Sequence, residues 1–110
     1  MHDTQQIKVL FEKSLPVFDA LGDPIRQQLI TLMIDGAQRS VAELAAETNV
    51  SRSTVSHHLR VLKDAHIIAD KKVGRKIFYY PKVDNYFQPV KELVQIVAEI
   101  ESNTEEQDNG

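Results

Sequence analysis

The sequence predicts one mainly α-helical domain that carries a single small β-hairpin. Apolar residues make up 42% of the 110 residues, which suits a globular domain with one modest core. They recur every three or four residues along most of the chain, as in amphipathic helices, but this period changes at residues 67–80. We expect the domain to span residues 1–101 and the polar, acidic residues 102–110 to form a disordered tail.

The first two helices are indicated by apolar periodicity and by a clear start signal. Pro16 should kink or divide the first helix, because proline lacks the N–H that a helix interior needs. Asp23 is a suitable N-cap for the second helix, and Pro24 follows where a missing N–H costs nothing. Gly36 provides the left-handed residue that ends this helix. The apolar residues of the first helix are Ile7, Leu10, Phe11, Leu15, Phe18 and Leu21.

A third, short helix and a tight turn come next. Ser40 and Glu43 have the spacing of a capping box, so this helix should run from residue 41 to about residue 47. Asn49 stands in the turn, where a residue that tolerates left-handed backbone is required. Ala45 is small enough to let the following helix approach closely. The pattern therefore predicts two helices packed together at a tight turn.

A fourth helix is predicted from residue 52 to about residue 65, with Ser51 as its N-cap. Ser53, Thr54 and Ser56 are short hydrogen-bonding residues, so the helix could enter the major groove of duplex DNA, which is about 12 Å wide. The simpler alternative is that these residues only cap and solubilise a surface helix. The outward-facing residues are Arg52, Ser53, Ser56, His57 and Arg60.

The β-hairpin is predicted from two strand-like runs, residues 67–73 and 76–80, that flank a glycine turn. The turn is basic, and its cations would hold phosphates beside the groove, like the wing of a winged helix-turn-helix protein. The alternative is a solvated edge hairpin, in which lysine only protects against strand pairing. The candidate phosphate contacts are Lys72, Arg75 and Lys76.

The net charge of −3 conceals an uneven distribution of charge. Residues 51–80 hold seven basic and two acidic residues, whereas the rest of the chain holds six basic and fourteen acidic residues. Because salt confines these fields to about 8–10 Å, the local charge decides what can dock. The basic segment favours double-stranded DNA as the partner.

Two segments carry specific motifs. Residues 20–26, ALGDPIR, and residues 51–63, SRSTVSHHLRVLK, resemble the opening signature and the recognition helix of the ArsR/SmtB family of bacterial winged-helix repressors. The resemblance covers about residues 18–81. It implies a homodimer built on the first and last helices, a palindromic operator and repression by blocking a promoter.

The resemblance also implies roles for single residues. The positions that meet DNA in such proteins hold Arg52, Ser53, Ser56 and His57. Arg52 stands where the family often has glutamine, which implies guanine rather than adenine as the preferred base.

The last helix is expected to begin at Asp84 and to form the dimer seam with the first helix. Its apolar residues alternate by four and three, the spacing of a helix–helix seam. A chain this short offers little other core for them. The expected dimer residues are Ile7, Leu10 and Phe11 of the first helix and Tyr86, Val90, Leu93, Val97 and Ile100 of the last.

The sequence lacks the metal ligands that metal-sensing members of the resembled family use. The chain has no cysteine, which excludes disulfides and thiolate ligands. One metal pocket of the resembled family begins at the position of Asp84, but Tyr86 replaces its first histidine, and Val97 and Ile100 stand near the expected histidine pair. We therefore expect no metal site and no cofactor, and we expect Asp84 to serve as an N-cap.

The histidines are expected to serve DNA contact or packing instead. His57 and His58 are adjacent and diverge by about 100° around a helix, which is poor geometry for binding one ion. His57 should face DNA and His58 should pack at the boundary between helices. His66 should end the fourth helix with a positive backbone angle.

The sequence favours a homodimeric, DNA-binding transcriptional repressor in the cytoplasm. No apolar run approaches the roughly 18 residues of a membrane span, and the first residues are too polar for a signal peptide. No nucleophile motif or glycine-rich phosphate loop indicates an enzyme. The alternatives are a repressor gated by a non-metal small-molecule or protein effector, and a winged-helix module that binds an acidic protein.

Overall fold

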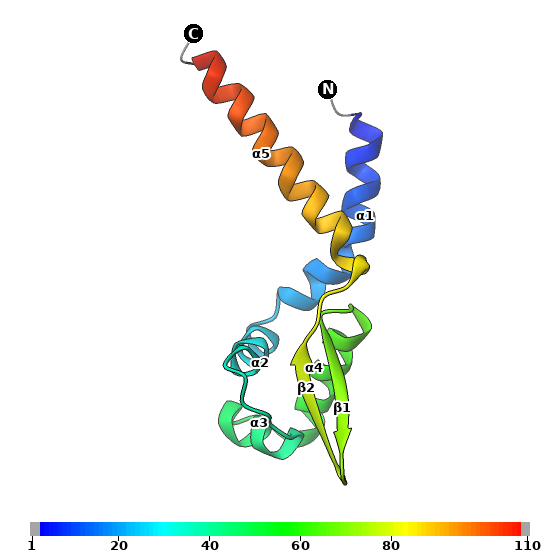
Figure 1. The fold of residues 1–110 in the computed structure, drawn as a ribbon, viewed down its shortest axis with the longest axis vertical. Coiled ribbons are helices and arrows are strands. Elements are labelled where there is room, and N and C mark those ends of the chain that lie inside the picture. Colours follow the sequence, from blue (N-terminus) through cyan, green and yellow to red (C-terminus); the bar gives the residue numbers. More distant parts are fainter. Residues whose placement is uncertain (1–2, 109–110) are drawn as a thin grey trace.

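The computed structural model describes residues 3–108, the last four of them by their backbone alone. Along the chain lie α1 (Thr4–Leu21), α2 (Pro24–Ile34), α3 (Val41–Thr48), α4 (Arg52–Asp64), β1 (Ile68–Val73), β2 (Lys76–Pro81), the 3₁₀ turn η1 (Asn85–Phe87) and α5 (Gln88–Asp108). In Figure 1, α2, α3, α4 and the hairpin form one end of the molecule, from which α1 and α5 extend. The chain measures 61 × 26 × 21 Å and has the predicted winged helix-turn-helix fold.

The main core lies where α1 to α4 meet the start of β1. Val55, Leu59 and Leu62 of α4 are at most 1% exposed. Full burial of one such side chain contributes about 1.5–3 kcal/mol, so α4 is held firmly with its opposite face outward. The other buried members of this core are Val17, Ala20, Leu29, Met33, Leu44, Ala45, Ala65, Ile67 and Ile68.

The predicted start signals of α2 and α3 are confirmed. The carboxylate of Asp23 accepts hydrogen bonds from the backbone N–H groups of Ile25 and Arg26, at 2.9 and 3.1 Å. Ser40 and Glu43 form the capping box in both directions. These side chains satisfy N–H groups that have no partner inside the helix, which fixes where each helix begins.

Left-handed backbone occurs at the predicted turns. Asn49 ends α3 with a φ of 56°, and Gly36 follows α2 with a φ of 83°. Gly74 has a φ of 63° at the hairpin turn, and His66 has a φ of 59° just after α4. Asn, His and glycine tolerate this conformation better than other residues do, which is why these turns could be predicted from the sequence.

The hairpin is antiparallel, with Val73 opposite Lys76 at its turn. At the other end of the hairpin, the N–H of Lys82 donates to the carbonyl of Ile67 at 2.9 Å. Tyr79 of β2 packs against the main core. The base of the hairpin is therefore anchored, while its turn extends away from the core, as Figure 1 shows.

Of the two outcomes predicted for Pro16, a kink or a division of the first helix, the division is wrong, because α1 runs unbroken from residue 4 to residue 21. Proline deprives the carbonyl of Glu12 of its helical partner, but Glu12 is exposed, so water can hydrogen-bond this carbonyl. Buried Leu10 and Val17 anchor the helix on both sides of the proline.

α5 also differs from the prediction, because it continues to Asp108 through the segment expected to be disordered from Ser102. Residues 90–108 contain no glycine or proline that would end the helix. Glutamate and glutamine, which are frequent here, are strong helix formers. The Thr104 hydroxyl donates to the Ile100 carbonyl at 2.9 Å within the same helix.

Candidate nucleic-acid interface

The outward face of α4 presents polar and basic side chains on a firmly held helix. The Ser51 side chain caps this helix by accepting from the N–H of Thr54 at 3.2 Å. The predicted contact residues on α4 are all exposed and lie within about two and a half helical turns: Arg52, Ser53, Thr54, Ser56, His57 and Arg60.

Some hydroxyl groups at the start of α4 are engaged with one another. The Oγ atom of Ser51 lies 2.8 Å from Oγ1 of Thr54 and 3.2 Å from Oγ of Ser53. These contacts give Ser53 and Thr54 a partly structural role, which is the simpler alternative that the sequence left open for them. In the described part of the chain, the polar α4 side chains that make no hydrogen bond or ion pair are those of Arg52, Ser56, His57, Arg60 and Asp64.

The hairpin carries its cations on exposed positions. Lys72, Arg75 and Lys76 are exposed and form no ion pair with any residue that the structure describes. Lys63 of α4, in contrast, donates a hydrogen bond to Asp70 of β1 at 2.8 Å, and this bond to the carboxylate raises the pKa of Lys63. This pair ties the base of the wing to α4, and sequence reasoning missed it because the two residues belong to different elements.

Arg26, within the ALGDPIR motif, joins three helices. Its Nε donates to the Ala20 carbonyl at 2.7 Å and its Nη2 to the Asp19 carbonyl at 3.1 Å, so it satisfies the C-terminal end of α1. Its Nη1 lies 3.1 Å from Nδ1 of His58 on α4. His58 is half-buried at this junction, which confirms its predicted place at the boundary between helices.

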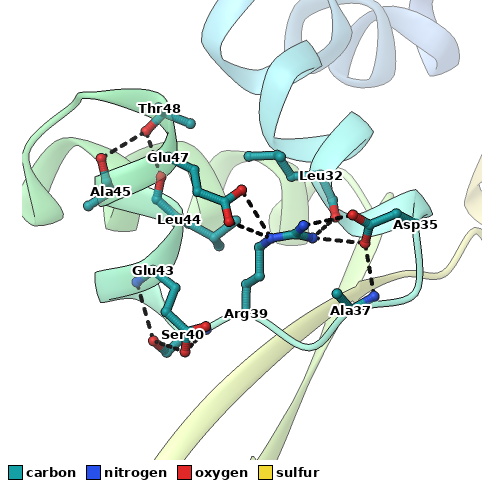
Figure 2. Close-up of polar contacts among 10 residues, drawn as sticks. All are labelled: Leu32, Asp35, Ala37, Arg39, Ser40, Glu43, Leu44, Ala45, Glu47 and Thr48. Carbon is teal, nitrogen blue, oxygen red and sulfur yellow. Dashed lines mark hydrogen bonds and ion pairs between the residues drawn. The ribbon is translucent and has the colours of Figure 1, made fainter.

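A second arginine, Arg39, ties α2 to α3, as Figure 2 shows. Its guanidinium makes two hydrogen bonds to Asp35 at the end of α2, at 2.8 and 2.7 Å, and also donates to the Leu32 carbonyl. On α3, a carboxylate oxygen of Glu47 lies 3.1 Å from Nε. The hydrogen bonds from Arg39 lower the pKa of Asp35 to about 2. This network sets the position of α3 beneath α4.

His66 connects the end of α4 to the start of the last helical segment. Its Nδ1 lies 3.0 Å from a carboxylate oxygen of Asp84, and its ring stacks on Tyr86 with ring centres 4.3 Å apart. Asp84 also accepts from the N–H of Tyr86 at 2.8 Å, so it is an N-cap as predicted, but of η1 rather than α5. The bond from His66, followed by that from Tyr86, lowers the pKa of Asp84.

The residues expected in the dimer seam divide into two groups. Leu10 and Leu93 are buried in a small cluster with Ile96, and Ile7 packs on this cluster. Val90 packs on the main core. Periodicity marked these residues as apolar but did not reveal that α1 and α5 of the same chain bury them. The expected residues that stay exposed are Phe11, Tyr86, Val97 and Ile100.

Sequence reasoning did not assign three further apolar residues to the seam. Leu15 and Phe18 of α1 are 54% and 40% exposed, and Val94 of α5 is 65% exposed. With Phe11, Val97 and Ile100 they form what we call the apolar stripe. Helical spacing on α1 already indicated Leu15 and Phe18, so this signal was present in the sequence.

The described part of the chain has neither a metal-binding cluster nor a membrane-spanning helix. Among residues 3–104, whose side chains the structure describes, no cluster of three or more histidine, aspartate or glutamate side chains could hold a metal ion. No helix among residues 3–108 is long and apolar enough to cross a membrane.

The fold and this surface define a winged helix-turn-helix regulator of transcription. Residues 23–70 match the family described as "Bacterial regulatory protein, arsR family". An uncharacterized HTH-type transcriptional regulator of Methanocaldococcus jannaschii is 34% identical, over 82% of this chain and 97% of its own length. The chain therefore belongs to the arsR family of bacterial regulatory proteins.

Two further comparisons agree with this assignment. The transcriptional repressor SdpR of Bacillus subtilis is 36% identical, over 57% of this chain and 69% of its own length. An ArsR-like transcriptional regulator from Rhodococcus sp. RHA1 has a TM-score of 0.75 at 27% identity, with 90% of each chain covered. These relatives are transcriptional regulators and not enzymes, in agreement with the sequence prediction.

Proposed function

We propose that this protein is a cytoplasmic homodimeric repressor that binds a palindromic operator. Each subunit would insert α4 into a major groove and rest its hairpin on the adjacent phosphates. The observation that carries this proposal is the set of exposed polar side chains on α4 and of exposed cations on the wing that have no partner among the described residues. The similarity to a transcriptional repressor supports the direction of regulation.

Arg52 is our candidate for reading a base. It is the first residue of α4, and the N-terminal residues of a recognition helix are the ones that contact base edges. Its guanidinium has no partner within the described residues, so its paired N–H donors are free. Two parallel donors match the O6 and N7 acceptors of guanine.

The wing would contribute affinity without sequence information. Lys72, Arg75 and Lys76 are point contacts to phosphate in this proposal, because they are exposed and lie on the hairpin rather than on α4. Each phosphate contact releases condensed counterions, so this part of the affinity weakens as the salt concentration rises.

A second copy of the chain is our proposed occupant of the apolar stripe. Phe11, Leu15 and Phe18 follow one face of α1 at intervals of four and three, and Val97 and Ile100 continue the exposed apolar surface on α5. Monomeric proteins rarely leave large contiguous apolar patches in water. A twofold dimer would cover both copies of this surface at once and would repeat α4 for two half-sites.

Control by a small-molecule effector is a second candidate, and one cavity favours it. A cavity of about 370 Å³ lies between the end of α2 and the hairpin, and its walls include Met33, Lys71, Phe78 and Tyr80. A ligand there would touch β2 and Lys71, so it would act directly on the wing. A screen of metabolites for a thermal shift that also changes operator binding tests this candidate.

Selection of duplexes from a random DNA pool tests the main proposal. We expect the recovered sequences to contain two inverted half-sites about one helical turn, or a multiple of it, apart. Absence of specific retention at moderate salt would overturn the proposal. Binding of an acidic protein in place of DNA would then favour the alternative function, a winged-helix module for protein interaction.

A further inference from the structure

We propose that Arg26, through its contact with His58, sets the spacing between half-sites that the dimer accepts. The inference rests on the proposed dimeric binding of DNA. Arg26 touches no DNA in this account, so it is a positioning residue. Arg26 lies in the first turn of α2. It stands between α1, which carries half of the apolar stripe, and α4, which faces DNA.

The joint between α1 and α2 is short. Only Gly22 and Asp23 separate the two helices, and Asp23 is committed to capping α2. Side chains of α2 reach back to the end of α1: Arg26 binds the Asp19 and Ala20 carbonyls, and the amide of Gln27 donates to the Leu21 carbonyl at 2.8 Å. The end of α1 is therefore held by α2 through directional hydrogen bonds.

The contact with His58 extends this joint to α4. Because the guanidinium is planar and rigid, its direction is fixed once two of its nitrogens bind the α1 carbonyls. The third nitrogen then defines where Nδ1 of His58 can lie, at 3.1 Å. Since arginine only donates, Nδ1 must accept this hydrogen bond. His58 lies next to His57, one of the candidate DNA contacts.

A small rotation at this joint is large on the scale of DNA. With half-sites about 34 Å apart, each recognition helix lies about 17 Å from the dimer axis. Reorientation at the joint that moves each α4 by only about 1.7 Å along the DNA away from the dimer axis would change the distance between the two recognition helices by about 3.4 Å, the rise of one base pair. Holding α1 and α4 at one angle is therefore a physical requirement for recognising one spacing.

The experiment measures affinity for palindromes whose half-sites are separated by successive single base pairs. We expect the wild-type dimer to prefer one spacing and to lose about ten-fold in affinity when one base pair is added or removed. Arg26→Gln and His58→Phe should reduce this penalty to less than about three-fold, while affinity for an isolated half-site stays within about two-fold. Both variants should remain dimeric by light scattering.

Matched variants separate positioning from general stability. His58→Asn retains an acceptor close to the place of Nδ1 and should restore the spacing preference. Arg39→Lys weakens a comparable arginine network, but one that ties α2 to α3, and it should leave the preference unchanged. His58→Phe leaves both α1 carbonyl contacts of Arg26 in place, so it decides the question if Arg26→Gln does not fold.

The two possible failures are distinguishable. If the wild-type protein binds no palindrome better than an isolated half-site, the proposed dimeric operator binding is wrong. If the wild-type protein prefers one spacing and His58→Phe keeps the same preference with the same penalty, the role of Arg26 and His58 is wrong.

Discussion

Arg39 and Asp35 meet in two parallel hydrogen bonds, with Nη1 and Nη2 at 2.8 and 2.7 Å from the two carboxylate oxygens. Asp35 is the C-cap residue of α2, and Arg39 precedes the capping box of α3. This paired geometry is the strongest form of an arginine–carboxylate contact, and it fixes the connection that leads into the helix-turn-helix.

The Arg39 contact predicts a pH dependence of folding. The hydrogen bonds from Arg39, followed by that from the Ala37 N–H, lower the pKa of Asp35 from 3.8 to about 2, so between these values the native state binds fewer protons than the unfolded state. The free energy of unfolding should therefore fall as the pH drops through this window, and the contribution is fully present above it. Urea unfolding between about pH 5 and about pH 2.5 measures the dependence.

Asp35→Asn is the variant that isolates this contribution. It should flatten the pH dependence in the acidic window, because it removes the titrating group, and it should also lower the stability near neutral pH. An unchanged slope in Asp35→Asn would show that other carboxylates are responsible.

Ser14 predicts a stabilising substitution. Its side chain is fully buried in α1, and its hydroxyl has no hydrogen-bond partner among the residues that the structure describes. Ser14→Ala should raise the free energy of unfolding by about 1 kcal/mol, because it removes an unsatisfied polar group and improves helix propensity. Urea unfolding at a fixed protein concentration checks this value. The exposed Ser102→Ala is the control and should change stability by less than about 0.5 kcal/mol; a destabilised Ser14→Ala would contradict the argument.

The apolar stripe predicts which substitution breaks the dimer. Val97 is 61% exposed in one chain, so Val97→Glu should leave the subunit folded but weaken dimerisation by at least about ten-fold, because the interface would bury a charge. Ser102→Glu adds the same charge on a different face of α5, about 140° away, and should have little effect. Sedimentation over a range of concentrations measures both. If Val97→Glu dimerised as tightly as the wild type, the dimer interface would have to lie elsewhere on the protein.

The wing predicts a change in salt dependence. Lys72→Ala or Arg75→Ala should weaken binding to all duplexes alike, and each should reduce the slope of log affinity against log salt by about 0.9. Titrations at several salt concentrations on operator and random DNA give both quantities. If either loss were confined to the operator, that residue would be reading bases and not phosphate.

Local signals in the sequence predicted the local parts of the fold. Ser40 and Glu43 are three residues apart and cap the same helix, so their roles follow from spacing alone. Asn49 could be placed in the turn because few residue types tolerate its backbone angles. The outward face of α4 followed from helical periodicity in the same way.

Contacts between distant elements could not be predicted in this way. Arg26 and His58 are 32 positions apart, and nothing in either segment indicates the other. Leu10 and Leu93 look like interface residues because periodicity shows that a face is apolar but not which helix covers it. The length of α5 was missed because a polar, acidic composition suits both a disordered tail and an exposed helix.

The affinity of Arg52→Ala for the selected operator and for random duplex, measured by fluorescence anisotropy at one moderate salt concentration, tests the central claim most directly. If α4 reads DNA through Arg52, the substitution should cost about 1–3 kcal/mol on the operator and much less on random duplex. An equal loss on both duplexes would contradict this account, because Arg52 would then be a phosphate contact with no part in recognition.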